Sequence, residues 1–195
     1  MNLHKLLQRR AADAGPIRVG VIGAGKFASM FLTQASVTPE LHVVGVADID
    51  VPKAKAALER TGWSAERFAA TSLDEAARTG LTAVVDDSMA LIAHPAVEVI
   101  LEITGNPLVG TDHAIAAIDN GKHVIMVNVE ADCMVGPLLQ RRAAAAGVVY
   151  SMAYGDQPAL ISELVDWCRT VGFEVIAAGK GTKYLPEYHD STPDT

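Results

Sequence analysis

A glycine-rich turn near the start of the chain carries the residue types that phosphate binding needs. Gly23, Gly25 and Ala28 follow an apolar run in the spacing Gly-x-Gly-x-x-Ala. In this pattern the first glycine permits a tight turn from strand to helix, and the second lets a pyrophosphate approach the backbone. The small third residue keeps the helix close to the sheet. The N–H groups at the start of that helix, with Lys26 and Phe27, are predicted to bind the phosphates of a dinucleotide.

Asp48 supplies the acidic residue expected downstream of such a turn. It follows the apolar run 41–46, and its interval from Gly25 is close to the roughly 20 residues at which a carboxylate binds the adenosine ribose. Asp50 is a second candidate, and the alternative for both is a polar loop that ends a strand. Strand, turn, helix and acid together predict binding of NAD or NADP. The carboxylate favours NAD because its charge repels the 2′-phosphate of NADP, although Lys53 nearby could receive that phosphate.

Polar residues also follow two later apolar runs, at the carboxyl ends of the strands predicted over 97–103 and 123–127. They are Thr104, Gly105, Asn106, Asn128 and Glu130. Ligands bind at this edge of an open α/β sheet, so we interpret the first three as facing the nicotinamide half of the cofactor. The alternative for these three is an ordinary turn from strand to helix. For Glu130, cofactor binding and the capping of a helix dipole remain equal alternatives.

Two lysines in the glycine-rich loop 179–184 are candidates for acid catalysis. Lys180 and Lys183 could protonate a carbonyl oxygen as hydride arrives, if burial lowers the pKa of the ammonium group. The alternative is a pair of solvated lysines. Asp156, in an earlier polar turn, could orient a substrate hydroxyl or cap the helix that begins near Pro158.

The elements that would position these residues alternate between strand and helix. Strands are predicted from β-branched apolar runs at 17–22, 41–46, 81–85, 97–103, 123–127 and 148–152, with a further one at 174–178. Helices are predicted at 2–14, 27–36, 53–61, after Ser72, and at 88–93, 108–120, 135–146 and 159–170. This alternation is typical of an α/β fold, a doubly wound parallel sheet of Rossmann type with helices on both faces.

The pattern divides the chain into three segments. Residues 1–16 are predicted to form a helix and a linker, and residues 17–153 a dinucleotide-binding Rossmann domain. Residues 154–195 are interpreted as the beginning of a catalytic region. The irregular last residues, 190–195, favour a chain that is cut short within that region.

The amino-acid composition of the chain limits the kinds of partner that it can bind. Half of the 195 residues are hydrophobic and the formal net charge is −7, so we expect a packed core and no binding of nucleic acid. No apolar stretch approaches the ~20 residues that span a bilayer, which predicts no membrane partner. Cys133 and Cys168 are isolated, which favours the cytoplasm. The histidines are scattered, so no metal site is predicted. The oligomeric state stays open, with a homo-oligomer as one alternative.

Three runs together resemble the homoserine-dehydrogenase-like oxidoreductases that carry a C-terminal SAF domain. The runs are residues 127–132, 154–158 and 178–189. The group includes the deoxyxylulose-phosphate reductoisomerase-like enzyme, and the resemblance extends over nearly the whole chain from Ile17. It implies an NAD(P)-dependent oxidoreductase that moves hydride between a nicotinamide and a small hydroxy or keto substrate, with a sugar phosphate as one candidate.

The chain departs from this family pattern in two places. Homoserine dehydrogenases have Asn-Lys after the fifth strand, whereas this chain has Asn128 followed by Val129. Members of the group also continue well beyond the matched part. The alternative to an oxidoreductase is therefore a non-catalytic NAD(P)-binding module or a truncated remnant.

Overall fold

The computed structural model describes residues 2–154, 157–179, 186–190 and 192 of the chain. The chain forms two compact units, Met1–Ala153 and Tyr154–Thr195. The candidate site lies in the first unit.

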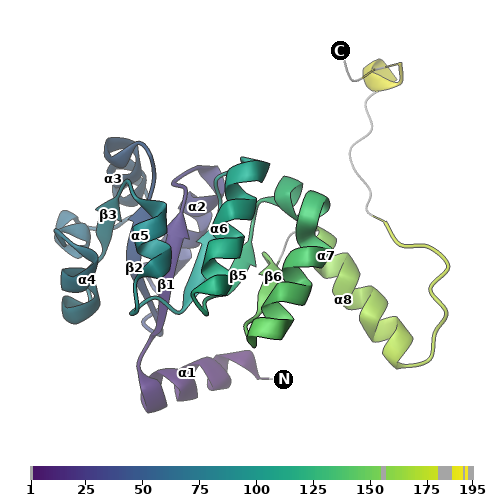
Figure 1. Ribbon diagram of the computed structural model, residues 1–195, viewed down its shortest axis with the longest axis horizontal. Coiled ribbons are helices and arrows are strands. Elements are labelled where there is room, and N and C mark those ends of the chain that lie inside the picture. Colours follow the sequence, from purple (N-terminus) through teal and green to yellow (C-terminus); the bar gives the residue numbers. More distant parts are fainter. Residues whose placement is uncertain (1, 155–156, 180–185, 191, 193–195) are drawn as a thin grey trace. The chain divides into compact units, whose positions relative to one another are not determined.

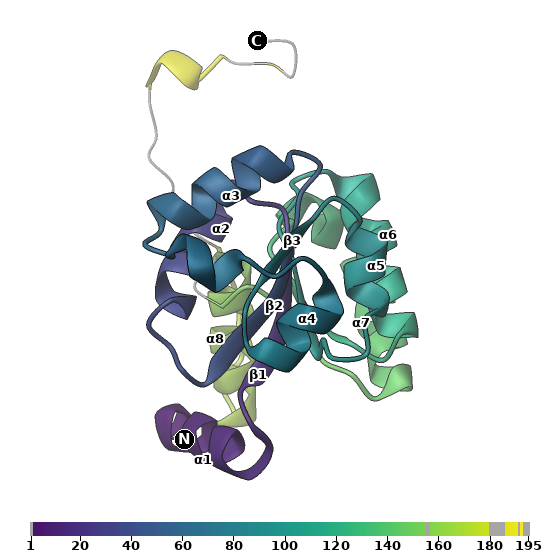
Figure 2. The same ribbon diagram turned by 90° about the vertical axis from the view of Figure 1, so that its left-hand side faces the viewer.

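A six-stranded parallel sheet forms the centre of the first unit (Figures 1 and 2). Its strands are β1 (Ile17–Ile22), β2 (Leu41–Ala47), β3 (Ala83–Val85), β4 (Val99–Glu102), β5 (His123–Met126) and β6 (Tyr150–Met152). They lie in the order β3-β2-β1-β4-β5-β6, and every neighbouring pair is parallel. The strand order reverses between β1 and β4, and such a switch point is where open α/β sheets bind ligands. The predicted doubly wound α/β sheet is confirmed.

Helices cover both faces of this sheet. One face carries α2 (Lys26–Ala35), α3 (Val51–Arg60) and the short helix η1 (Ala65–Phe68). The other carries α4 (Leu73–Thr79), α5 (Ser88–Ala93), α6 (Pro107–Asp119) and α7 (Val129–Ala146). Among the helices that the structure describes, none combines the length and the apolar character needed to cross a membrane.

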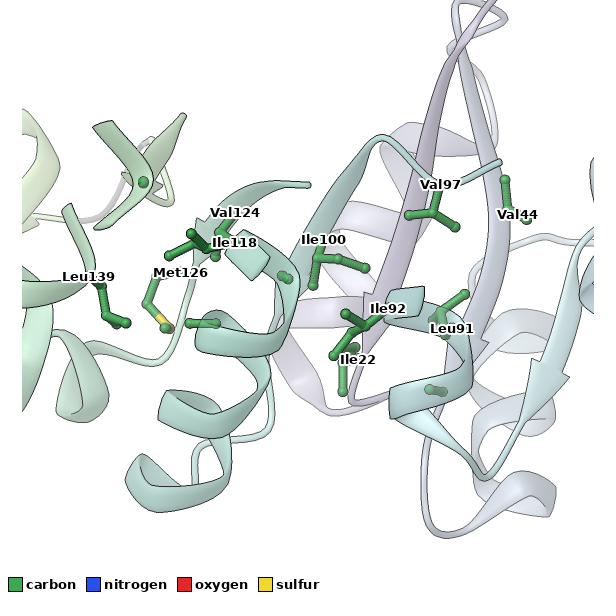
Figure 3. Packing of buried hydrophobic residues seen from close by; sticks show 14 of the residues in the cluster. Ile22, Val44, Leu91, Ile92, Val97, Ile100, Ile118, Val124, Met126 and Leu139 are labelled. Carbon is green, nitrogen blue, oxygen red and sulfur yellow. The ribbon is translucent and has the colours of Figure 1, made fainter. Parts of the chain in front are cut away.

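Side chains that alternate along the strands build a separate core on each face. In β1, Val21 belongs to the cluster beneath α2 and α3, whereas Ile22 belongs to the cluster beneath α5, α6 and α7. This alternation follows from the two-residue period of a strand. Figure 3 shows the second cluster, in which Leu91, Ile100 and Met126 are fully buried. The sheet is therefore fixed from both sides, and the loops at its edge start from rigid strand ends.

The N-terminal helix α1 (Leu3–Ala14) is attached to the sheet through one ion pair rather than through a core. None of its residues is buried. Arg10 lies 2.6 Å from Oε1 of Glu98 and donates a second hydrogen bond of 2.8 Å to the carbonyl of Gly15. The backbone N–H of Arg18 donates to the other oxygen of Glu98 at 3.0 Å. The predicted helix is confirmed, and it is held by partly exposed polar contacts.

Helix α7 begins six residues earlier than the sequence pattern predicts. The periodicity indicates a helix over 135–146, but the structure starts it at Val129. Asn128 causes the earlier start, because its side-chain oxygen accepts a hydrogen bond of 3.1 Å from the N–H of Ala131. An N-cap of this kind satisfies a backbone donor of the first turn, so the helix can begin ahead of the apolar periodicity that predicts it.

The second unit contains helix α8 (Gln157–Thr170) and the short helix η2 (Pro186–Tyr188). Gly172, at a φ of +89°, follows the end of α8. The strand predicted over 174–178 is wrong, since these residues have no regular structure. A strand needs a neighbour for its backbone hydrogen bonds, and none of the described residues of this unit provides one. Ile176 is accordingly 91% exposed.

Candidate functional site

An open cleft of about 520 Å³ lies at the carboxyl edge of the sheet. Its lining comes from residues that follow β1, β2, β3 and β4, so segments far apart in the sequence meet at the switch point. Of the residues predicted to bind the cofactor, Gly23, Gly25, Asp48, Thr104 and Asn106 line this cleft. The structure therefore brings the glycine-rich turn, the acidic residue and the loop after β4 into one place.

The remaining predicted residues are outside the cleft lining found in the described part of the chain. They are Lys26, Phe27, Ala28, Gly105, Asn128 and Glu130. Ala28 is fully buried in the core between α2 and the sheet, as expected for the small third residue of the pattern. Lys26 and Glu130 are exposed in the first turns of α2 and α7, and Asn128 is 2% exposed.

The two glycines of the turn have different surroundings. Gly23 has a φ of +98°, and a Cβ added there would lie 3.0 Å from the backbone carbonyl of Ile103. Gly25 has an ordinary φ of −76°, and an added Cβ would meet no described atom within 4 Å. The first glycine is thus required by the fold, whereas the second leaves open space at the cleft.

The N-terminus of α2 differs from the starts of the other α-helices of the first unit. In α1, α3, α4, α5, α6 and α7 the N-cap side chain accepts a hydrogen bond from the first turn. At α2 the N-cap is Gly25, and no side chain in the described ranges caps it. An anion bound there would supply the missing acceptor and would interact favourably with the helix dipole.

Asp48 braces the glycine-rich turn against the end of β2. Its Oδ2 accepts a hydrogen bond of 2.7 Å from the backbone N–H of Ala24, and its Oδ1 accepts one of 2.9 Å from that of Asp50. Asp50 in turn caps α3 by accepting from the N–H of Lys53 at 3.0 Å. Asp48, Asp50 and Lys53 all line the cleft. The carboxylate of Asp48 therefore holds the turn in place and retains lone pairs for further donors.

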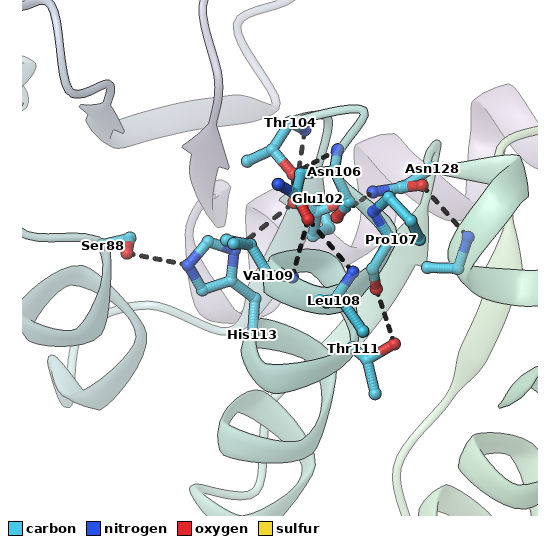
Figure 4. A network of polar contacts seen from close by, with 11 residues as sticks. Ser88, Glu102, Thr104, Asn106, Pro107, Leu108, Val109, Thr111, His113 and Asn128 are labelled. Carbon is cyan, nitrogen blue, oxygen red and sulfur yellow. Dashed lines mark hydrogen bonds and ion pairs between the residues drawn. The ribbon is translucent and has the colours of Figure 1, made fainter.

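A buried polar group lies behind the loop that follows β4 (Figure 4). The side chain of Glu102 is completely buried, and its Oε1 accepts from the N–H of Thr104 at 3.2 Å and from the Thr104 hydroxyl at 2.5 Å. The same oxygen lies 3.3 Å from Nδ1 of His113, which is 6% exposed. On the far side of the ring, Nε2 lies 2.8 Å from the hydroxyl oxygen of Ser88. We call Ser88, Glu102, Thr104 and His113 the Glu102 network.

Asn128 connects this region to α7. Its amide nitrogen donates a hydrogen bond of 2.9 Å to the carbonyl of Asn106, while its amide oxygen caps α7. Asn106 itself caps α6 by accepting from the N–H groups of Leu108 and Val109 at 3.1 and 3.2 Å. A Cβ added at Gly110 would lie 2.6 Å from the Asn128 amide nitrogen and 2.9 Å from Oε2 of Glu102. Because Gly110 has no side chain, the side chains of Glu102 and Asn128 can pack directly against α6 at this position.

Sequence reasoning missed the roles of Glu102, Ser88 and His113. One signal was available for Glu102: it is a carboxylate in an otherwise apolar run that ends in a polar turn. The run also contains Glu98, which is not buried. The pattern alone does not separate the two acids, because burial depends on which helix covers each position.

The three predicted catalytic residues, Asp156, Lys180 and Lys183, lie outside the described residues. Their roles stay predictions. In the described segments, no group of three or more His, Cys, Asp or Glu side chains is arranged to hold a metal ion.

Two family models match consecutive parts of the chain. The model described as "Oxidoreductase family, NAD-binding Rossmann fold" matches residues 17–126, which is more than half of the chain. The model described as "Oxidoreductase DRL, catalytic domain" matches residues 155–195. The first match covers most of the sheet and the cleft, and the second covers the second unit.

Individual relatives agree with these matches. A homoserine dehydrogenase from Methylobacillus glycogenes is 38% identical over 45 residues, which are 23% of this chain and 11% of that protein. The structure of a homoserine dehydrogenase from Thiobacillus denitrificans is similar with a TM-score of 0.55 at 22% identity, covering 70% of this chain and 29% of that one. A 3-ketoreductase from Actinomadura kijaniata, in complex with NADP, is similar with a TM-score of 0.55 at 22% identity, covering 78% and 44%.

These three proteins are considerably longer than the part that this chain matches, since the chain spans less than half of each. At 22% identity the two solved structures support the fold alone. Together with the family models, the sequence match confirms the resemblance to homoserine-dehydrogenase-like oxidoreductases.

Proposed function

Because the chain belongs to the oxidoreductase family with an NAD-binding Rossmann fold, we propose that its cleft binds NAD or NADP for hydride transfer. The partner in the reaction is a small hydroxy or keto compound. The resemblance to the group that includes the deoxyxylulose-phosphate reductoisomerase-like enzyme supports a sugar phosphate as one such substrate.

The uncapped start of α2 carries this proposal. Six other helices of the first unit satisfy their first turn with a side chain, whereas α2 begins at Gly25 beside an open cleft. A pyrophosphate is an anion of the size and charge that this position accepts, and close approach to the backbone requires the absence of a side chain. The residues present therefore fit the dinucleotide.

Asp48 and Lys53 bear on the choice between the two cofactors. We infer a preference for NAD, because the Asp48 carboxylate can accept bonds from both ribose hydroxyls and repels a 2′-phosphate. Lys53 also lines the cleft, in the first turn of α3, and would be the cation nearest to such a phosphate. NADP therefore remains the second candidate.

The nicotinamide supplies the hydride chemistry when the cofactor is bound. The first unit binds and orients it, with Thr104 and Asn106 on the nicotinamide side of the cleft. We assign the second unit to the catalytic region, in line with the match of residues 155–195 to a catalytic domain. Lys183 or Lys180 would protonate the substrate oxygen, and Asp156 would orient a hydroxyl.

Binding of NADH and NADPH to the wild type and to Gly25→Val tests the proposal. A Cβ at Gly25 meets no described atom within 4 Å, so the substitution leaves the fold intact and fills the space that the pyrophosphate needs. We expect isothermal titration to show binding by the wild type and none by the variant. Met30→Val is the matched control, since it places the same side chain at an exposed position of α2. Equal affinity in Gly25→Val and the wild type would contradict the proposed site.

A further inference from the structure

The buried carboxylate of Glu102 sets the direction of the hydrogen bonds in the Glu102 network. A carboxylate only accepts, so Nδ1 of His113 and the hydroxyl of Thr104 both donate to it. With Nδ1 as the donor to Glu102, the other ring nitrogen, Nε2, is the acceptor for the hydroxyl of Ser88. The two hydroxyls that line the cleft, those of Ser88 and Thr104, therefore use their protons within the protein.

Thr104 consequently presents only oxygen lone pairs to the cleft. The Thr104 hydroxyl donates its proton to Oε1 of Glu102, with 2.5 Å between the two oxygens. The backbone nitrogen of Asn106 lies 3.4 Å from the Thr104 hydroxyl oxygen, which is a long hydrogen bond. Such a hydroxyl accepts hydrogen bonds from sugar hydroxyls or from a carboxamide, and it does not bind the oxygens of a phosphate. The nicotinamide half of a dinucleotide offers both kinds of donor.

Packing alone does not explain why a carboxylate is buried at position 102. Its Oε1 receives three donors, whereas Oε2 is buried and has no hydrogen-bond partner among the described residues. A buried carboxylate oxygen without a partner is unfavourable, and an apolar side chain of similar size would avoid the penalty. The retained carboxylate indicates a use in the site that the network supports.

We propose that Glu102 is a positioning residue that holds the Thr104 hydroxyl as a pure acceptor for the nicotinamide half of the bound cofactor. This inference rests on the proposed function. His113, fixed on its other side by Ser88, keeps the Glu102 carboxylate turned toward Thr104. Ser88 follows β3 and Thr104 follows β4, so the network also joins the adenine side of the cleft to its nicotinamide side.

The experiment compares a whole dinucleotide with its adenine half. Titrations use ADP and whichever of NADH and NADPH binds the wild type more tightly. Thr104→Val and Glu102→Gln should each weaken dinucleotide binding by about threefold to tenfold, the scale of one hydrogen bond, and leave ADP binding unchanged. Thr104→Ser keeps the hydroxyl and should restore wild-type affinity. Thr111→Val is the matched control, because the Thr111 hydroxyl donates to the Pro107 carbonyl of the same helix and has no other partner among the described residues.

The double variant Glu102→Gln with Thr104→Val separates positioning from direct contact. If Glu102 acts through Thr104, the double variant binds the dinucleotide no more weakly than Thr104→Val alone. Additive losses, an equal loss of ADP affinity, or no loss in Thr104→Val would each overturn the proposal. Thermal unfolding of every variant shows whether it folds. If Glu102→Gln does not fold, the comparison of Thr104→Val with Thr104→Ser keeps the test decisive. A wild type that binds neither dinucleotide would refute the proposed function itself.

Discussion

The two halves of the cleft differ in the groups that form them, which are mainly backbone groups in one half and buried side chains in the other. The first half consists of the turn Gly23–Gly25, the start of α2 and Asp48, and it offers mainly backbone N–H groups and space. The second half is the loop after β4, which rests on buried side chains from β4, α6 and α7. Backbone geometry is encoded locally, whereas the buried network depends on three elements that meet only in the folded chain.

Gly110→Ala tests that dependence and should have the largest effect. The added Cβ would lie 2.6 Å from the Asn128 amide and 2.9 Å from Glu102, and neither side chain can withdraw from a buried position without losing hydrogen bonds. We expect the free energy of unfolding, measured with urea, to fall by roughly 3 kcal/mol. Thr111→Ala, at the neighbouring position of α6, is the control and should change the stability little.

An unchanged stability in Gly110→Ala would mean that the second half tolerates rearrangement. The comparison between the halves would then fail, because both would be determined by local backbone geometry. A loss of stability with unchanged nucleotide affinity would instead separate the packing of the second half from its role in binding.

The same difference explains what the sequence predicted and what it did not. The strands and most helices follow from β-branched runs and apolar periods, and the turn Gly23–Gly25 is recognisable because spacing alone defines it. Asn106 and Asn128 were placed correctly after strands, yet both act as helix caps in the structure. The two partners of His113, Glu102 and Ser88, lie 11 and 25 residues earlier in the chain. No local pattern reports contacts of that kind.

Gly23→Ala tests the first half of the cleft, at the turn that begins it. Alanine would be strained at a φ of +98°, and its Cβ would press on the carbonyl of Ile103 at 3.0 Å. We expect the free energy of unfolding to fall by about 1–2 kcal/mol. Gly62→Ala is the matched control, because Gly62 has a φ of +85° with no described atom near its missing Cβ. A larger loss at Gly23 than at Gly62 measures the contact with the loop after β4, and equal losses would show that strain alone accounts for the effect.

Asp48 has one role in the fold and another in binding. Removing the carboxylate eliminates the repulsion of a 2′-phosphate and the acceptor for the ribose hydroxyls together. Asp48→Ala should therefore shift the ratio of NADP(H) to NAD(H) affinity toward NADP(H) by about tenfold, or ~1.4 kcal/mol.

Asp48→Asn separates the two roles of this residue. Its amide oxygen can still accept from the N–H of Ala24, which lies 2.7 Å from the present carboxylate, so the turn keeps its brace while the charge is lost. Both variants should shift the cofactor ratio in the same direction, but only Asp48→Ala should also weaken both cofactors by loosening the turn. Titration of the two variants with NADH and NADPH measures ratio and absolute affinity at once. If neither variant changes the ratio, Asp48 only braces the turn, and Asp50, which lines the same cleft, becomes the ribose ligand to test.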